Sequence, residues 1–286
     1  MLVIALALIS ATGYGTADFL AGYATRRDTS AIRVTLVVYT TGTLVMLAAA
    51  LPSLLHPGTR PPLSAIAWGA LSGAGCGAGA LFLAEGFRRS EFSVAGPMSA
   101  VIGAGGAALA GLGLGERLAG KAWVGIVLAL PAIALVSASI GPRAQRGLSG
   151  PGLGVVAGIG CAISYAALAQ AKTGGIWPLL AVQVASLAVT GSVAAVTGKL
   201  DWPQAGPDWW LSAASGVIGA MAAVAYLAAA RAGTMAVAAV ITALFPAATI
   251  ALAAAVEKER IGPARLAGLA LAGASVWLIA VSGTPG

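Results

Sequence analysis

The chain has 286 residues, of which 59% are hydrophobic and 9% are charged, and its mean hydropathy is +0.93. Soluble globular domains carry roughly a quarter charged residues, so this chain cannot cover a water-facing surface and most of it must face lipid. The net charge of +7 comes from Lys and Arg residues placed a few at a time between apolar stretches, without a basic stripe interleaved with aromatic residues. This arrangement is typical of interfacial anchors and argues against nucleic-acid binding.

The apolar stretches predict an all-α integral membrane protein with about ten transmembrane helices, because a hydrocarbon core of about 30 Å needs about 20 apolar residues per helix. The stretches lack strict alternation, which excludes a membrane β-barrel. In the first half of the chain we expect spans at about 2–23, 34–51, 63–87, 92–114 and 122–140. In the second half we expect them at about 153–171, 177–196, 210–230, 235–256 and 264–281.

Asp18 is the most informative residue of the first span, because it is a charged side chain within an apolar stretch. It lies roughly a turn and a half inside the end of that span, where a charged group costs several kcal/mol unless it faces a partner or water. Tyr14 lies four residues earlier, on the same helix face. Asp18 therefore either forms a polar cavity site that binds an amine or cation or carries a proton, or is a structural carboxylate. In the structural role it would pair with Arg26 or Arg27 or cap a neighbouring helix.

The third span combines closely spaced glycines with an acidic residue at its end. Gly69, Gly73 and Gly77 are four residues apart, which predicts a tight seam with another helix, or a sliding surface for rocking motion. Glu85 precedes two arginines by three and four residues, so an interfacial ion pair is the simpler interpretation. A place for Glu85 at a cavity or gate is the alternative.

A polar pattern occurs twice in the chain. A shift of 143 positions (259 minus 116) superposes Arg88 on Arg231 and Glu116–Arg117 on Glu259–Arg260. Each match lies in a short polar gap between long apolar stretches, so it indicates an internal duplication of a membrane unit. Glu116 and Glu259 are predicted to be loop or helix-end residues with a structural or gating role.

The duplication divides the chain into a first five-helix repeat at residues 1–141, a linker at 142–152 and a second five-helix repeat at 153–286. The linker is polar and rich in Gly and Pro. Because each repeat has an odd number of spans, the second would enter the membrane with opposite polarity, which makes the repeats inverted. Inverted repeats are common in transporters, whose binding site lies near the middle of the membrane between them.

Other polar side chains and prolines inside the spans are candidates for a cavity wall. The polar candidates are Ser99, Tyr165, Gln170, Tyr226 and Thr242, with Tyr165 expected to take the place of Tyr14 in the second copy. Pro97 and Pro246 free backbone carbonyls within their helices, which is tolerated where the backbone is buried in protein or lines a cavity. A simple packing kink is the alternative for each proline.

Three motifs resemble those of EamA-type transporters in the drug/metabolite transporter superfamily. They are Tyr14–Gly22 followed by Arg26–Arg27, Arg88–Pro97, and Gly115–Arg117 with Gly125, the last echoed by Glu259–Arg260 with Gly268. The second copy departs from the pattern, with Val240 where the first has Pro97. The resemblance implies ten spans, a cavity lined by spans one, three, four, six, eight and nine, and cytoplasmic termini. The loops after odd-numbered spans carry the greater share of Lys and Arg, which favours the opposite orientation.

The residues offer little for enzyme chemistry. The single histidine, His56, lies in a Pro-flanked loop, and Cys76 and Cys161 lie inside apolar spans without metal-ligand spacing. We therefore expect no enzyme activity, cofactor or metal.

We expect a multi-pass carrier of the bacterial inner membrane that moves a small metabolite, such as an amino acid or similar amphiphile, or a drug, by alternating access. The resemblance implies export. Its partners would be membrane lipid and the small-molecule substrate, with protons as a candidate coupling ion through Asp18. The alternatives are a membrane-embedded scaffold, a lipid-modifying enzyme or a nonselective channel.

Overall fold

The computed structural model describes residues 2–27, 30–55, 62–89, 92–116, 120–136, 150–199, 206–257 and 262–281. Over these residues the chain forms eleven α-helices and no strand. In the first half they are α1 (Leu2–Arg26), α2 (Ala31–Leu55), α3 (Leu63–Arg89), α4 (Phe92–Gly113) and α5 (Gly120–Val136). In the second half they are α6 (Gly150–Gln170), α7 (Trp177–Val196), α8 (Pro207–Ala232), α9 (Met235–Thr242), α10 (Phe245–Glu257) and α11 (Pro263–Val281).

Most of these helices have the length and composition of membrane spans. Seven helical stretches are long and apolar enough to cross a membrane: α1, α2, α3, α6, α7, α8, and the stretch Met235–Val256 that α9 and α10 form together. Shorter apolar stretches lie in α4, α5 and α11. Large side chains such as Ile9, Leu44 and Trp277 are more than half exposed, whereas most of the buried residues are Ala and other small side chains. This distribution suits a protein whose outer surface contacts lipid.

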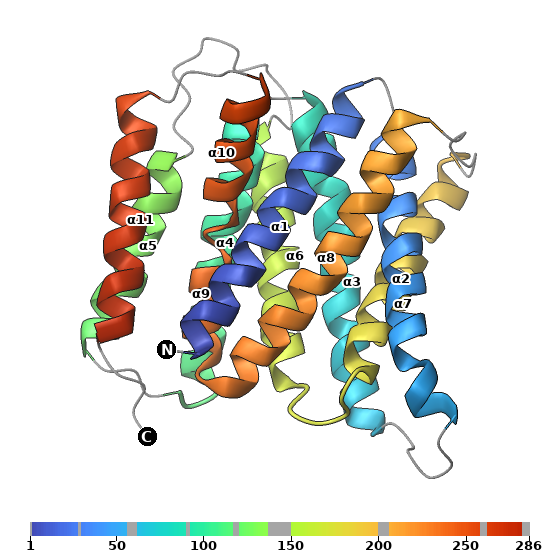
Figure 1. The fold of residues 1–286 in the computed structure, drawn as a ribbon, viewed down its shortest axis with the longest axis horizontal. Coiled ribbons are helices and arrows are strands. Elements are labelled where there is room, and N and C mark those ends of the chain that lie inside the picture. Colours follow the sequence, from blue (N-terminus) through green and yellow to red (C-terminus); the bar gives the residue numbers. More distant parts are fainter. Residues whose placement is uncertain are drawn as a thin grey trace.

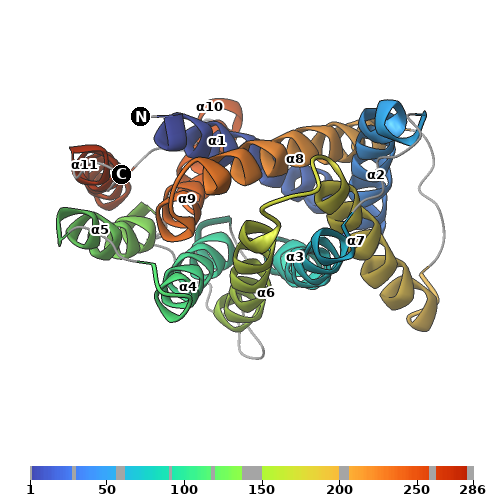
Figure 2. The same cartoon turned by 90° about the horizontal axis from the view of Figure 1, so that it is seen from below.

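The helices form two rows. In the view from below, α1 and α8 lie side by side along one row and α3, α4 and α6 along the other (Figure 2). α5 pairs with α11 at one edge of the molecule, and α2 pairs with α7 at the opposite edge. α1 begins and α11 ends at the same end of the molecule (Figure 1). α6 begins at Gly150, so residues 150–152 of the expected linker are helical and the rest of it lies outside the described residues.

α3 contacts two helices through two sets of glycines. Gly69, Gly73 and Gly77 face α7, and a Cβ at Gly77 would lie 2.9 Å from the Cα of Ser186. Gly75 faces α6, where a Cβ would lie 2.7 Å from the carbonyl oxygen of Gly160. In lipid there is little hydrophobic force between helices, so such close backbone contact is a main source of attraction. The seam expected from the glycine spacing is therefore the α3–α7 contact.

Two serines that lie 143 positions apart make similar bonds between neighbouring helices. Ser72 of α3 donates a hydrogen bond to the backbone oxygen of Ser164 in α6 at 2.9 Å. Ser215 of α8 donates to the backbone oxygen of Ala17 in α1 at 2.8 Å. When the α3–α6 and α8–α1 pairs are aligned on these bonds, Ala17 falls on Ser164.

The expected single span at 235–256 is broken. α9 ends at Thr242 and α10 begins at Phe245, with a turn between them. Pro246 has no N–H, so the carbonyl of Thr242 loses its helical donor. At the same place the N–H of Leu244 donates to the oxygen of Ile241, three residues earlier, at 3.1 Å, so the chain tightens just after α9.

Candidate functional site

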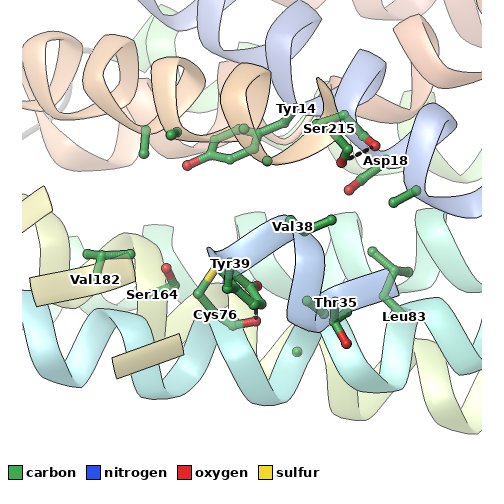
Figure 3. A pocket seen from close by; sticks show the side chains of 18 of the residues that line it. Tyr14, Asp18, Thr35, Val38, Tyr39, Cys76, Leu83, Ser164, Val182 and Ser215 are labelled. Atoms are coloured by element: carbon green, nitrogen blue, oxygen red, sulfur yellow. Dashed lines mark hydrogen bonds between the residues drawn. The ribbon is translucent and has the colours of Figure 1, made fainter. Parts of the chain in front are cut away.

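A cavity of about 140 Å³ lies between the two rows of helices. Its wall is built by α1, α2, α3, α6, α7 and α8, with Phe245 from the start of α10 (Figure 3). The family resemblance implied walls from spans one, three, four, six, eight and nine. The structure corrects this, because α2 and α7 contribute to the wall and none of its described residues comes from α4. α4 packs behind α6, where Gly154 and Gly158 bring the two backbones close.

Asp18 is the one charged side chain on the described wall, which includes no Lys, Arg or His. It is half-buried, and within the described part of the chain its carboxylate has no hydrogen-bond or ion-pair partner. Arg27, one of its expected partners, instead lies 3.3 Å from Asp208 of α8 and 5.6 Å from the ring centre of Tyr23. The structural interpretation of Asp18 as the partner of Arg27 is therefore wrong.

Tyr14 and Tyr165, two further candidates from the sequence, also lie on the cavity wall. Alignment on the bonds of Ser72 and Ser215 places α1 on α6 with a shift of 147 positions (164 minus 17). In this alignment Asp18 falls on Tyr165, and Tyr14 falls on Cys161. The alignment therefore does not support the expectation that Tyr165 takes the place of Tyr14. The two halves of the wall are thus unlike: one has a carboxylate where the other has a phenol.

Sequence reasoning missed polar wall residues on α2 and α7. Gln183 lies on the wall and is 6% exposed. Tyr39 lies on the wall, and its hydroxyl donates to the backbone oxygen of Cys76 at 3.1 Å and lies 3.4 Å from the Cys76 Sγ. Each is a polar or amphipathic residue in the middle of an apolar span, and this position could have indicated a place on the cavity wall. It was overlooked because the resemblance assigned these spans no place in the cavity.

The remaining polar candidates lie away from the described wall. Ser99 is fully buried and donates to the oxygen of Gly96 at 2.8 Å, within its own helix. Tyr226 is fully buried, and its hydroxyl donates to the backbone oxygen of Tyr165 at 2.7 Å. The rings of Tyr165 and Tyr226 are 4.9 Å apart, so Tyr226 holds a wall residue in place from behind. Gln170 is the last residue of α6, and its side chain is half-buried.

Thr242 and Pro246 lie at the break between α9 and α10, and Pro97 lies inside α4. Thr242 is fully buried, and its hydroxyl has no hydrogen-bond partner among the described residues. Pro246 is buried beside Phe245, which lines the cavity. Pro97 lies in the first half of α4. The backbone break at Pro246 thus reaches the cavity through its neighbour.

Of the acidic candidates outside the cavity, Glu85 and Glu116 are described by the structure and Glu259 is not. Glu85 is half-buried near the end of α3, and the side chains of Arg88 and Arg89 lie outside the description. Glu259 also lies outside it. Of the described His, Cys, Asp and Glu residues, none form a group of three or more that could hold a metal ion.

Glu116 joins the end of α4 to the start of α9. Gly115 has a positive φ of 85°, and the N–H of Glu116 bonds back to the oxygen of Gly111 at 3.0 Å, so the chain turns sharply after α4. The Glu116 carboxylate then accepts hydrogen bonds from the N–H groups of Met235 at 2.6 Å and Ala236 at 3.0 Å. These are the first two residues of α9, where the helix dipole favours negative charge. Glu116 is therefore a helix cap supplied from the other half of the chain.

Arg231 holds neighbouring helix ends in a similar way. It is the penultimate residue of α8, and its guanidinium donates to the backbone oxygen of Ala171 at 2.8 and 3.2 Å and to that of Thr173 at 3.1 Å. These carbonyls follow the end of α6. Together with Glu116, it ties the ends of four helices near the α8–α9 connection, at the end of the molecule where α1 begins and α11 ends (Figure 1).

Comparison with known proteins identifies the family of the first half. The EamA-like transporter family model matches residues 1–138. These residues belong to the EamA-like transporter family. The resemblance inferred from the motifs, to this family of the drug/metabolite transporter superfamily, is thereby confirmed for them. Together with the seven long apolar stretches, the match makes the chain a multi-pass membrane protein.

The whole chain also shares its fold with solved structures. One crystal structure, described only as that of a protein, aligns with a TM-score of 0.74 at 17% identity, over 97% of this chain and 96% of its own. At that identity the likeness concerns the fold alone. A search among curated proteins found no match. The EamA-like family is a transporter family.

Proposed function

We propose that this EamA-like protein is a secondary transporter that moves a small metabolite or drug across the bacterial inner membrane by alternating access. The observation that carries the proposal is Asp18: a carboxylate on the wall of a central cavity, with no partner in the described protein. A charge at such a depth is costly without a partner, so intramembrane carboxylates commonly mark substrate or ion pathways. The family supports transport over catalysis.

The proposed architecture is ten spans in two inverted repeats, residues 1–141 and 153–286, joined by 142–152. In it, α4, α5 and α11 also cross the membrane, and α9 with α10 forms one span. The matching bonds of Ser72 and Ser215 support this arrangement. So do the matching helix contacts, since α4 packs on α6 as α9 and α10 pack on α1. The start of α1 and the end of α11 lie at one end of the molecule, which agrees with an even number of spans.

Alternating access would require the helix ends on one side of the cavity to separate while those on the other side close. The bonds of Glu116 and Arg231 tie four helices at the end of the molecule where α1 begins and α11 ends. In the proposed cycle these bonds hold that end closed and break when it opens. The glycine seam between α3 and α7 provides a surface along which packed helices can slide.

Export and proton coupling are further parts of the proposal. Asp18 would bind the coupling proton, and the other titratable groups on the described wall are three tyrosines, Tyr14, Tyr39 and Tyr165, and the thiols of Cys76 and Cys161. Without an opposing charge on that wall, a proton is one of the few partners available to the carboxylate. In purified protein in liposomes, an imposed pH gradient should drive flux, and Asp18→Asn should abolish the dependence on the gradient.

The experiment that tests transport is flux into liposomes from a panel of labelled amino acids, amines and drugs. Saturable flux of one chemical class supports the carrier. Flux that rises linearly with concentration would indicate a channel. Folded protein that moves no member of a broad panel would favour a scaffold or a lipid-modifying enzyme.

A further inference from the structure

We infer that the cavity selects organic cations, and that a ligand's ammonium group binds at Asp18 among the tyrosines of the wall. This rests on the proposed transport function and names the substrate class. It also excludes zwitterionic amino acids as preferred substrates, although amino acids were among the molecules expected from the sequence.

The charge balance of the cavity is the first argument. The described wall has one carboxylate and no Lys, Arg or His, so its net charge is negative whenever Asp18 is ionised. Arg27, which directly follows the end of α1, pairs with Asp208 outside the cavity. A buried charge is stable only when it is paired and hydrogen-bonded. A cationic ligand would supply the missing charge and the N–H donors together.

The surroundings of the carboxylate are the second argument. Tyr14 lies one helical turn before Asp18 on α1, and Tyr39 faces them from α2 across the cavity (Figure 3). The remaining wall is mostly Ala, Gly, Leu and Val. The faces of aromatic rings attract ammonium groups, and the attraction strengthens where water is excluded. The wall thus offers one ionic contact, aromatic faces for the cation and apolar surface for a carbon skeleton.

The lack of a cationic group on the wall is the third argument, and it discriminates between substrate classes. An amino acid brings a carboxylate as well as an ammonium group. Here that carboxylate would meet no described cationic side chain, and the helical backbone N–H groups are already bonded within their helices. It would also lie in one small cavity with Asp18, and like charges brought together in this way repel each other.

The size of the cavity bounds the ligand. A volume of about 140 Å³ corresponds to about five water molecules at about 30 Å³ each, and an engineered cavity of about 150 Å³ binds benzene. The cavity therefore suits a ligand with a single aromatic ring. Phenethylamine, phenylalanine and 2-phenylethanol share one aromatic skeleton of about this size and differ in charge: cationic, zwitterionic and neutral.

Calorimetric titration of the detergent-solubilised full chain with these three compounds tests the inference. We expect phenethylamine to bind at least about tenfold more tightly than either of the others, as for an ion pair supported by cation–π contact. Asp18→Asn should remove its advantage over 2-phenylethanol. Asp208→Asn makes the same chemical change outside the cavity and should keep that advantage.

Several results would overturn the inference. They are no binding of phenethylamine, equal binding of the neutral alcohol, equal or tighter binding of phenylalanine, or an unchanged preference in folded Asp18→Asn. The three-ligand comparison uses the unaltered chain, so it decides charge selectivity even if the variant does not fold. Flux of another class of substrate in liposomes, without binding of phenethylamine, would contradict this inference and leave the proposed transporter standing.

Discussion

Replacing Glu116 with alanine tests whether the two halves are joined by a helix cap. The side chain accepts two hydrogen bonds, from the N–H groups of Met235 and Ala236, at 2.6 and 3.0 Å. Thr234, at the usual capping position, makes no side-chain bond to α9. Loss of a capping side chain typically costs about 0.5–2 kcal/mol, and a buried N–H left unpaired about 1–3 kcal/mol.

Glu116 is half-buried, so water can replace part of what is lost, and we expect a destabilisation of about 2 kcal/mol. For a chain of 286 residues, that corresponds to a fall in melting temperature of about 3 °C. The seven tryptophans allow unfolding to be followed by intrinsic fluorescence of the purified protein in detergent.

Asp208→Ala is the matched control, because it removes another carboxylate contact between two helices. The Arg27–Asp208 pair is partly exposed, with side chains 50% and 29% accessible. Such surface pairs contribute about 0–1 kcal/mol. If Glu116→Ala melted no lower than Asp208→Ala, the cap would not stabilise the contact between the halves, and the account of Glu116 would be wrong.

Two further predictions concern the glycine seam and the cavity thiols. Gly73→Ala would place a Cβ against the Val182 carbonyl of α7 and should destabilise the protein by about 1–3 kcal/mol. In the control Gly191→Ala the new Cβ meets open space, so this variant should be neutral or stabilised by up to about 1 kcal/mol. Thermal unfolding of the two variants separates these outcomes. The chain's two cysteines, Cys76 and Cys161, both line the cavity, so a cationic methanethiosulfonate should label them about tenfold faster than an anionic one. Asp18→Asn should bring that ratio close to one; an unchanged ratio, or equal rates in the unaltered chain, would contradict the charge assigned to the cavity.

The features that depend on local sequence could be predicted. Seven of the ten expected spans are found as long apolar stretches, and they follow from apolar length. The α3–α7 seam follows from glycines four residues apart, and the interest of Asp18 follows from its depth in α1. Pro246 indicated a disturbance in its helix because a missing N–H is visible in the sequence. The disturbance is the break between α9 and α10.

The features that depend on packing between distant helices could not be predicted. Gln183 and Tyr39 reach the cavity because α7 and α2 pack against glycine-bearing faces of α3 and α8, which no local pattern specifies. Tyr226 was assigned to the wall because its polarity was visible, but its position behind Tyr165 was not. Glu116 was correctly expected at a helix end. The helix it caps begins 119 residues further along the chain.

Counterflow in liposomes tests the central claim most directly. Vesicles containing the protein are preloaded with an unlabelled compound from the flux panel and diluted into a trace of the same compound with a label. A carrier must exchange its cargo, so the account predicts transient accumulation of label above the outside concentration, and loss of that accumulation in Asp18→Asn but not in Asp208→Asn. Equilibration without overshoot for every compound that crosses would indicate a channel and contradict the account.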